Sequence, residues 1–347
     1  MNKATVIGHF GFGQQFLDGQ TVKTKIITEE LKNRLGEGEV YTIDTHGGLK
    51  TLVKAPFQVL RALKKSKNVL IFPAHNGLKV FGRLLPLLRP FFKGRRIHYV
   101  VIGGWLASFL KDKKGLAKAL KRFDGIYVET NTMKKALEEQ GFENIYVMPN
   151  CKRLTVLAED ELVYPTEAPY KLCTFSRVMK EKGIETAVNV IKNVNDRLGY
   201  TAYSLDIYGQ VDSSQTEWFK SLKQSFPYYI NYGGLVPFDE SVNVLKNYFA
   251  LLFPTYYDGE GFAGTLIDAF SAGVPVVASD WKYNAEIVSD ATGFVYETHN
   301  DKALTDLLLL IIDTPSLMTE KKRNCLDETQ KYKIENVISV LTDRLDV

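Results

Sequence analysis

The chain alternates short apolar runs with amphipathic stretches along most of its 347 residues. The run Ala4–Gly8, for example, has strand length, and Thr21–Leu35 then spaces its apolar residues as a helix does. This alternation is typical of βαβ units, in which crossover helices join parallel strands. It predicts an α/β fold with doubly wound parallel sheets.

The alternation runs through both halves of the chain. The expected strands are Ala4–Gly8, Val40–Asp44, Asn68–Pro73, Ile97–Ile102, Gly125–Glu129, Ile145–Met148, Leu172–Phe175, Ser204–Tyr208, Tyr229–Tyr232, Leu251–Pro254, Val274–Ala278 and Phe294–Tyr296. The expected helices include Thr21–Leu35, Pro56–Lys67, Met133–Gln140, Ile184–Arg197, Lys302–Ile312 and Ile334–Leu345.

The charge balance supports a division into two domains. Residues 1–150 hold 25 Lys and Arg against 12 Asp and Glu, whereas residues 151–347 hold 19 against 28. The strand–helix pattern also lapses after Pro149-Asn150. We therefore expect Rossmann-like domains at 1–155 and 156–330, with a C-terminal helix at 331–347 that packs back toward the first domain. Ligands of such sheets sit at the carboxyl ends of the strands, so the site is expected in the cleft between the domains.

Composition excludes several classes of protein. With 45% hydrophobic and 24% charged residues, the chain reads as an ordinary globular protein rather than a disordered or fibrous one. Its three cysteines form no CxxC pair, which argues against a disulfide framework or a cysteine zinc site. The longest apolar stretch, Leu307–Ile312, is too short to cross a bilayer, and no secretory signal is visible. These features predict a cytoplasmic protein.

The densest motif spans residues 258–280 and reads DGEGFAGTLIDAFSAGVPVVASD. It combines a glycine loop that carries Glu260 with a helix that carries Asp268 eight residues later. The backbone N–H groups of Phe262, Ala263, Gly264 and Thr265 and the following helix N-terminus favour an anion. Carboxylates there suit sugar or ribose hydroxyls. A tight turn with a helix cap is the alternative interpretation.

A second motif, SRVMKEKGI, begins at Ser176. Arg177 ends a predicted strand and Lys182 follows five residues later beside a helix start, so both cations can converge on one diphosphate. An exposed Arg–Glu pair of little energetic value is the alternative.

Together these motifs resemble the signature of glycosyltransferase family 4, whose members are retaining enzymes with the GT-B fold. Glu260 matches the first acid of the Glu-Gly-Phe-Gly block, and residues 272–277 match its Ala-Gly-Val-Pro-Val-Val tail. The chain differs where it has Asp268 for the second Glu and Ala263 for a loop Gly. Arg177 and Lys182 match the Gly-Arg-x4-Lys-Gly block. Gly209 and Val236 fall in segments similar to those that approach the nucleotide.

The first domain resembles the family mainly in architecture. The loop at residues 10–21 occupies the place of the family's N-terminal glycine loop, so Gly19 and Gln20 are expected on the acceptor side of the cleft. Its glycines do not fit the GxGxxG spacing of a dinucleotide loop. His75 and Gly104 end neighbouring strands and are further acceptor-side candidates, although His75 also suits a plain loop hydrogen bond.

The segment from Phe81 to Arg96 mixes apolar bulk with basic residues, and Arg61, Lys64, Lys65, Lys67, Lys111, Lys113 and Lys114 add to it. Such a face suits an anionic membrane surface. A core helix with a solvated basic face is the alternative. We see no recognition module for nucleic acid, and none is expected as a partner.

The resemblance implies a retaining transfer of a sugar from a nucleoside-diphosphate sugar, with UDP favoured, to a glycan or lipid-linked acceptor. Glu260, Arg177 and Lys182 are the expected catalytic residues, and Asp268 the expected ribose ligand. No metal site and no cofactor are expected, because the chain has no Asp-x-Asp motif. Two alternatives remain open: another GT-B enzyme such as a nucleotide-sugar epimerase, and a non-catalytic subunit that binds glycan or a partner transferase.

Overall fold

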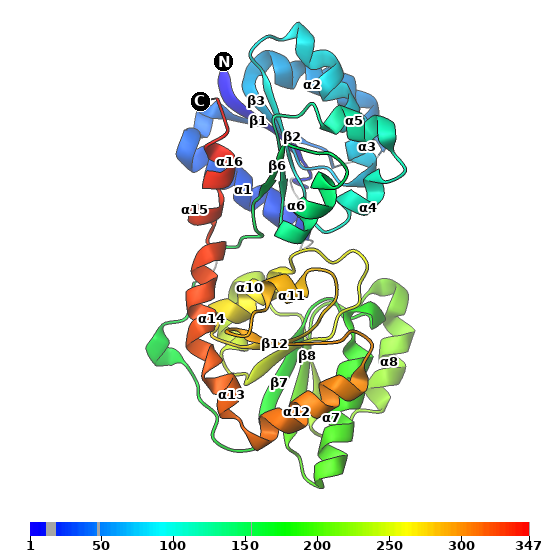
Figure 1. The fold of residues 1–347 in the computed structure, drawn as a ribbon, viewed down its shortest axis with the longest axis vertical. Helices are drawn as coiled ribbons and strands as arrows, with labels where there is room; N and C mark the ends of the chain where they lie inside the picture. The colour runs from blue at the N-terminus through cyan, green and yellow to red at the C-terminus, as the bar shows by residue number, and fades with distance from the viewer. Residues whose placement is uncertain (12–18, 47–48, 154, 347) are drawn as a thin grey trace. The chain divides into compact units, whose positions relative to one another are not determined.

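The computed structural model describes residues 1–11, 19–46, 49–153 and 155–346, and these form two compact units. Unit 1 consists of Met1–Arg153 and Tyr332–Val347, and unit 2 is Leu154–Lys331. Each unit has a six-stranded parallel sheet with helices on both faces (Figure 1), so the predicted α/β class with two doubly wound sheets is confirmed. Most of the predicted N-terminal loop, at 12–18, lies outside the described residues.

The sheet of unit 1 has the strand order β2-β1-β3-β4-β5-β6. Its strands are β1 (Asn2–Gly8), β2 (Val40–Asp44), β3 (Ser66–Ile71), β4 (Arg96–Val100), β5 (Gly125–Val128) and β6 (Ile145–Val147). Its helices are α1 (Gly19–Leu35), η1 (Glu37–Glu39), α2 (Leu49–Lys65), α3 (His75–Leu88), η2 (Arg89–Phe91), α4 (Leu106–Leu110), α5 (Lys114–Leu120), α6 (Asn131–Glu138), α15 (Ile334–Val337) and α16 (Ser339–Thr342).

The sheet of unit 2 has the strand order β12-β11-β10-β7-β8-β9. Its strands are β7 (Tyr170–Phe175), β8 (Tyr203–Tyr208), β9 (Ile230–Gly234), β10 (Ala250–Phe253), β11 (Val276–Ser279) and β12 (Gly293–Tyr296). Its helices are η3 (Glu159–Glu161), η4 (Lys180–Lys182), α7 (Ile184–Leu198), η5 (Ser213–Gln215), α8 (Thr216–Gln224), η6 (Phe238–Glu240), α9 (Ser241–Leu245), α10 (Gly264–Ser271), α11 (Asn284–Ile287), α12 (Asp301–Asp313), α13 (Ser316–Thr319) and α14 (Lys321–Thr329), followed by η7 (Gln330–Tyr332).

Helix α7 illustrates how the sequence specifies these elements. It lies between Gly183 and Gly199, both of which adopt positive φ, as is common for glycines at helix ends. The side chains that it buries recur every three or four residues, which is the period of a helix packed on one face. Burying each aliphatic side chain of this kind contributes about 1.5–3 kcal/mol.

The C-terminal residues pack within unit 1. Ile334, Ile338 and Leu341 join the apolar core beneath α1 (Figure 1), and Asn68 at the start of β3 binds the backbone of both Lys3 and Asp346. One helix at Ile334–Leu345 was expected, but two short helices, α15 and α16, are present.

The predicted start of the second helix at Pro56 was wrong, since α2 begins at Leu49 and holds Pro56 in its interior. An interior proline lacks the N–H that would bond one turn back. Ala55, Val59 and Ala62 are fully buried on the inner face of this helix. Their burial offsets the lost backbone bond. Among the described residues, no helix has the length and apolar content needed to span a membrane.

His98 is a titratable residue in the core of unit 1. Its ring is fully buried in β4, and Nδ1 lies 3.1 Å from the Tyr127 hydroxyl. Burial lowers the pKa of His98 to about 4, against 6.5 for an exposed histidine. Between these two pH values the unfolded chain therefore binds a proton that the folded protein does not.

We predict that this difference makes unit 1 less stable as the pH falls from 6.5 toward 4, by about 1.4 kcal/mol per pH unit. The His98→Gln variant lacks the titrating group, so its unfolding free energy should fall less steeply over the same range. Urea unfolding at several pH values measures both slopes. Equal slopes for the two proteins would show that His98 titrates normally.

Candidate functional site

The predicted motifs of unit 2 converge where its strand order reverses. The chain moves from β7 outward to β8 and β9, then returns to place β10 on the other side of β7. Crossovers therefore leave the carboxyl ends of β7 and β10 open, which is where ligands bind in sheets of this kind. Arg177 follows β7, and Glu260 lies in the loop after β10.

Gly183 brings these two loops into contact. It has a φ of +71°, and a Cβ atom there would lie 2.0 Å from the carbonyl oxygen of Pro254, directly after β10. Only glycine fits so close an approach of two backbones. The amide of Tyr256 also donates to the Glu181 carbonyl at 2.8 Å. These contacts set Lys182 against the loop that carries Glu260.

Lys182 and Glu260 form a nearly buried ion pair. The Nζ atom lies 2.5 Å from Glu260 Oε2, and the two side chains are only 12% and 7% exposed. The Thr255 hydroxyl donates to the same carboxylate oxygen at 2.8 Å. The rings of Phe253 and Tyr257 lie near the ammonium group, at 5.6 and 5.1 Å from their centroids. Both predicted catalytic groups thus have fixed positions.

Arg177 is held much more loosely. Its side chain is 53% exposed, and its only ion pair among the described residues is with Asp212 at 3.6 Å. Hydrogen bonds from Ser214, with a smaller effect from Arg177, hold the pKa of Asp212 below its usual value. The guanidinium therefore remains accessible to an anion from solvent.

The predicted donor residues Gly209 and Val236 flank Arg177 from the next strands. Gly209 has a φ of +132°, and a Cβ atom there would lie 1.8 Å from the carbonyl oxygen of Ser176, so this position also requires glycine. Its amide donates to the Gly234 carbonyl at 2.8 Å. The half-buried Val236 follows two residues later. The carboxyl ends of β7, β8 and β9 are thus joined backbone to backbone.

Helix α10 begins directly after the glycine loop, and its N-cap residue, Ala263, makes no capping hydrogen bond through its side chain. The first amides of a helix have no partner within it, so those of Gly264 and Thr265 are suited to an anion. The Thr265 hydroxyl is buried and has no hydrogen-bond partner among the described residues. Ala263 and Gly264 are half-buried, whereas the Phe262 side chain is buried.

Asp268 points into the protein. It is 3% exposed, and its carboxylate accepts a hydrogen bond from the Ser241 hydroxyl of α9 at 3.2 Å. It lies on the second turn of α10, one turn beyond the amides that suit an anion. The predicted ribose contact stays a prediction.

In unit 1, Gly19 is the first residue of α1, and the Gln20 side chain donates to the Phe72 carbonyl at 3.3 Å, just after β3. His75 is the first residue of α3, and its ring stacks on Trp105 with a centroid distance of 4.0 Å. Gly104 precedes Trp105 in the turn after β4. Two of the four first-domain candidates, His75 and Gly104, thus follow the carboxyl ends of β3 and β4, and the Gln20 side chain reaches the same edge.

The surroundings of His75 disfavour a positive charge on its ring. Partial burial, with Lys79 and Lys113 nearby, lowers the pKa of His75 below 6.5. Phe109 meets the same ring edge-on at 5.0 Å, and Lys113 lies 4.1 Å from the centroid of Phe109. No pattern in the sequence indicated that Trp105 stacks on His75, because this contact depends on how two loops meet.

Sequence reasoning missed a buried ion pair in unit 1. Lys23 of α1 lies 2.7 Å from Glu129, with side chains 3% and 2% exposed, and Glu129 also accepts from the Gly103 amide at 3.3 Å. The pair joins α1 to the ends of β4 and β5. The two residues are 106 positions apart, and no local pattern marks them.

No group of three or more His, Cys, Asp or Glu side chains that could hold a metal ion occurs within the described ranges. Cys151, Cys173 and Cys325 are all buried and unpaired.

Solved structures share this fold of two α/β units, each with a parallel sheet. Sucrose-phosphate synthase from Thermosynechococcus elongatus matches with a TM-score of 0.75 over 98% of this chain and 97% of that one, at 15% identity. HepE from Anabaena, in complex with UDP, matches with a TM-score of 0.76 over 99% of both chains, at 12% identity. The chain therefore has the GT-B glycosyltransferase fold.

The sequence comparison names the family. Residues 163–332 match the profile of the family "Glycosyl transferases group 1". The chain is also 24% identical over 230 residues to a UDP-N-acetylglucosamine–peptide N-acetylglucosaminyltransferase GtfA subunit from Streptococcus gordonii. That match covers 65% of this chain but only 44% of the relative's length. The predicted resemblance is thus confirmed, and the narrower assignment to family 4 stays a prediction.

The Lys182–Glu260 pair supports a stability prediction. Removing one member of a buried ion pair leaves an uncompensated charge, which costs about 3–5 kcal/mol. We therefore predict that Lys182→Met and Glu260→Gln each destabilise unit 2 by about that amount. The double variant leaves no net buried charge, so its loss should be well below the sum of the two.

Urea unfolding of the four proteins measures this coupling as a double-mutant cycle. A loss in the double variant that equals the sum of the single losses would show that the two groups do not interact.

Proposed function

We propose that the protein is a retaining glycosyltransferase that moves a sugar from a nucleoside-diphosphate sugar to a glycan or lipid-linked acceptor. The observation that carries the proposal is the placement of Arg177 and the Lys182–Glu260 pair at the reversal point of the unit 2 sheet, beside the N-terminus of α10. The match of residues 163–332 to a glycosyltransferase family supports it.

The diphosphate is the part of the donor that needs positive charge. Arg177 offers an exposed planar fork of donors, and the first amides of α10 add the positive end of the helix dipole. Lys182 contributes a fixed ammonium group that Glu260 already holds. These groups stabilise the charge that develops on the leaving diphosphate, which is usually the largest catalytic contribution. We propose that they do so without a metal.

The two acids serve the hydroxyl groups of the donor. Glu260 binds Lys182 and Thr255 through Oε2, and a carboxylate has further lone pairs that accept from sugar hydroxyls. Asp268 is assigned to the ribose. Gly209, directly after β8, and Val236, two residues after β9, are assigned to the nucleotide. In this mechanism the donor phosphate itself deprotonates the acceptor.

We propose UDP as the nucleotide. The HepE structure contains UDP, and the Streptococcus gordonii relative is named for a UDP-sugar. Acceptor binding is assigned to unit 1, through Gly19, Gln20, His75 and Gly104. A cytoplasmic location at the inner face of a membrane fits a lipid-linked acceptor and the excess of basic residues in 1–150.

Binding of the donor is the first prediction of this proposal. A ligand that binds only the folded protein stabilises it by about 2.7 kcal/mol at a hundredfold excess over its Kd. We therefore expect UDP and UDP-sugars, without added metal, to raise the melting temperature, whereas GDP and ADP should raise it less. Differential scanning fluorimetry makes this comparison.

Arg177→Ala should abolish most of the UDP shift and lower turnover by at least about tenfold, since one charge-assisted contact is worth roughly 1.5–3 kcal/mol. Arg197→Ala is the matched control, because Arg197 is an exposed arginine at the far end of α7. A UDP shift that survives Arg177→Ala would contradict the proposed site. UDP binding without transfer to a competent acceptor would instead favour a non-catalytic subunit, and donor conversion without any acceptor would favour an epimerase.

A further inference from the structure

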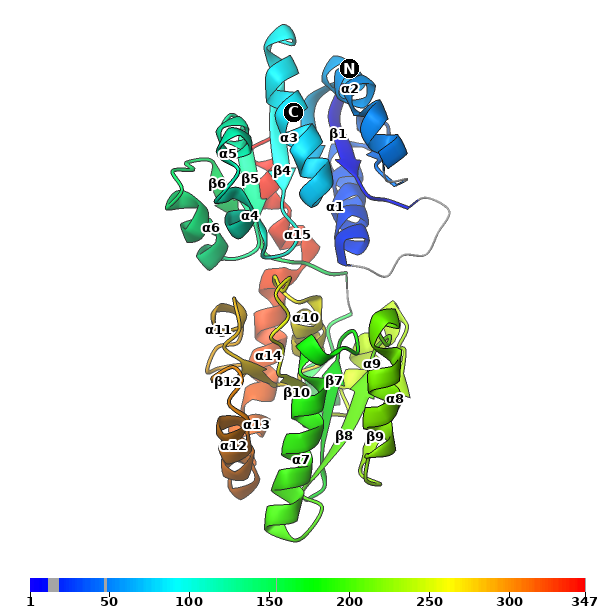
Figure 2. The same ribbon diagram turned by 90° about the vertical axis from the view of Figure 1, so that its right-hand side faces the viewer.

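A long stretch of unit 1 lacks negative charge. Residues 45–111 contain thirteen Lys and Arg and no Asp or Glu. This stretch includes α2, β3, α3, η2, β4 and α4, so it forms a large part of one unit. Helices α2 and α3 pack side by side (Figures 1 and 2). A surface of this kind attracts anions wherever its side chains are exposed.

Helix α2 is apolar on two opposite sides. Its inner side buries Ala55, Val59, Ala62 and Leu63 in the core. Its outer side exposes Val53, Phe57 and Leu60, which are 77%, 76% and 40% accessible and follow the spacing of one helix face. Folding therefore leaves this outer stripe uncovered. Large apolar side chains gathered on one exposed face usually mark a binding surface.

The exposed cations of α2 border this stripe. Lys54, Arg61, Lys64 and Lys65 are all exposed, and no acidic side chain of the helix balances them. Near the end of α3 and in η2, Leu87 and Phe91 are also exposed, at 62% and 79%. Apolar side chains flanked by Lys and Arg are the pattern of helices that lie in a membrane interface.

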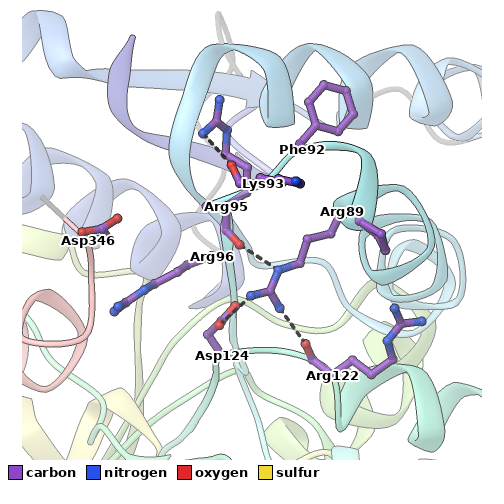
Figure 3. A pocket seen from close by; sticks show the side chains of 10 residues that line it. Arg89, Phe92, Lys93, Arg95, Arg96, Arg122, Asp124 and Asp346 are labelled. Atoms are coloured by element: carbon purple, nitrogen blue, oxygen red, sulfur yellow. Dashed lines mark hydrogen bonds and ion pairs between the residues drawn. The ribbon is translucent and has the colours of Figure 1, made fainter.

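A basic hollow adjoins the C-terminal end of α2 (Figure 3). It has a volume of about 530 Å³, and its lining includes Arg89, Lys93, Arg95, Arg96 and Arg122 with Asp124 and Asp346. The Arg95 Nε atom donates to the Leu63 carbonyl at 2.8 Å, which fixes the hollow against α2. The hollow lies at the amino ends of β4 and β5, whereas the acceptor-side candidates lie at carboxyl ends.

Most of the positive charge in this hollow is not neutralised. Arg89 binds the carbonyls of Arg95 and Arg122 and pairs with Asp124 at 2.9 Å. Carbonyl acceptors orient a guanidinium but leave its charge in place. Figure 3 shows the Arg122 and Lys93 side chains extending away from the Arg89–Asp124 pair. The hollow therefore suits a phosphate group.

We propose that the outer stripe of α2, together with Leu87, Phe91 and the basic hollow, docks on the surface of an anionic lipid bilayer. The apolar side chains enter the boundary between headgroups and acyl chains, and the cations bind lipid phosphates. The inference rests on the membrane contact within the proposed function and assigns it to particular residues. Docking would bring the acceptor-binding unit to lipid-linked acceptors.

The test measures flotation of the whole protein with vesicles of phosphatidylcholine alone or mixed with phosphatidylglycerol. We expect binding to the mixed vesicles, little binding to phosphatidylcholine, and release at high salt. Lys54→Gln with Lys64→Gln should weaken binding about tenfold or more, since each cation near an anionic surface contributes roughly fivefold. Val53→Ser with Phe57→Ser should weaken it by at least a similar factor.

Matched controls come from exposed positions in unit 2. Lys220→Gln with Lys223→Gln removes the same charge, and Tyr228→Ser with Leu310→Ser removes exposed apolar surface. Both should bind vesicles as the parent protein does. All four variants change exposed side chains, and the UDP-induced melting shift of each reports whether the donor site is intact.

Several outcomes would overturn the proposal: no flotation with either vesicle, equal losses in the controls, or unchanged binding in the Val53→Ser, Phe57→Ser variant. Binding to single-stranded RNA that depends on the α2 cations and exceeds vesicle binding would also overturn it. UDP-induced melting shifts without vesicle binding would contradict membrane docking but not the proposed donor site. Vesicle binding without UDP shifts would refute the proposed donor instead.

Discussion

The ion pair between Lys182 and Glu260 is the contact on which the candidate site depends. It joins the loop after β7 to the loop after β10, at the point where the unit 2 sheet reverses its strand order. A buried pair of this kind gains little net stability, because desolvation opposes the Coulomb attraction. The pair instead fixes the positions of both side chains, because each buried charge is stable only beside the other. Neither side chain can move without leaving its partner buried and unpaired.

Close contacts between backbone segments also hold the Lys182–Glu260 pair in place. Gly183 lets the chain pass against the Pro254 carbonyl, and Gly209 does the same against the Ser176 carbonyl. Each glycine removes the one side chain that would separate two strand-end loops. The loops therefore meet closely enough for a lysine from one to reach a carboxylate on the other. Arg177 lies between these contacts yet stays half exposed, so one cation is fixed and another remains open to a ligand.

The sequence predicted the two sheets well, because strands and helices leave local patterns. Apolar runs alternate with helical stretches, and the glycines of the motifs mark the tight backbone approaches at positions 183 and 209. Pairing was harder to foresee. The action of Arg177 and Lys182 on one anion stays a prediction, whereas the pairing of Lys182 with a residue 78 positions away left no local pattern in the sequence. The Lys23–Glu129 pair was missed for the same reason, since its members are 106 positions apart. The helix start predicted at Pro56 was wrong because the buried side chains of α2 outweigh one missing hydrogen bond.

Among the paired cations that the structure describes, two are nearly buried, and their partner acids differ in what else they can bind. Lys23 and Lys182 each lie within 2.7 Å of a carboxylate and are almost enclosed, so each presents little free charge to solvent. The second oxygen of Glu129 accepts a hydrogen bond from the Gly103 amide. Glu260 is different, because Lys182 and Thr255 both bind Oε2, and Oε1 has no partner among the described residues. Lys182 thus aims the carboxylate, and the free oxygen gives Glu260 the capacity to accept a hydrogen bond from a hydroxyl group.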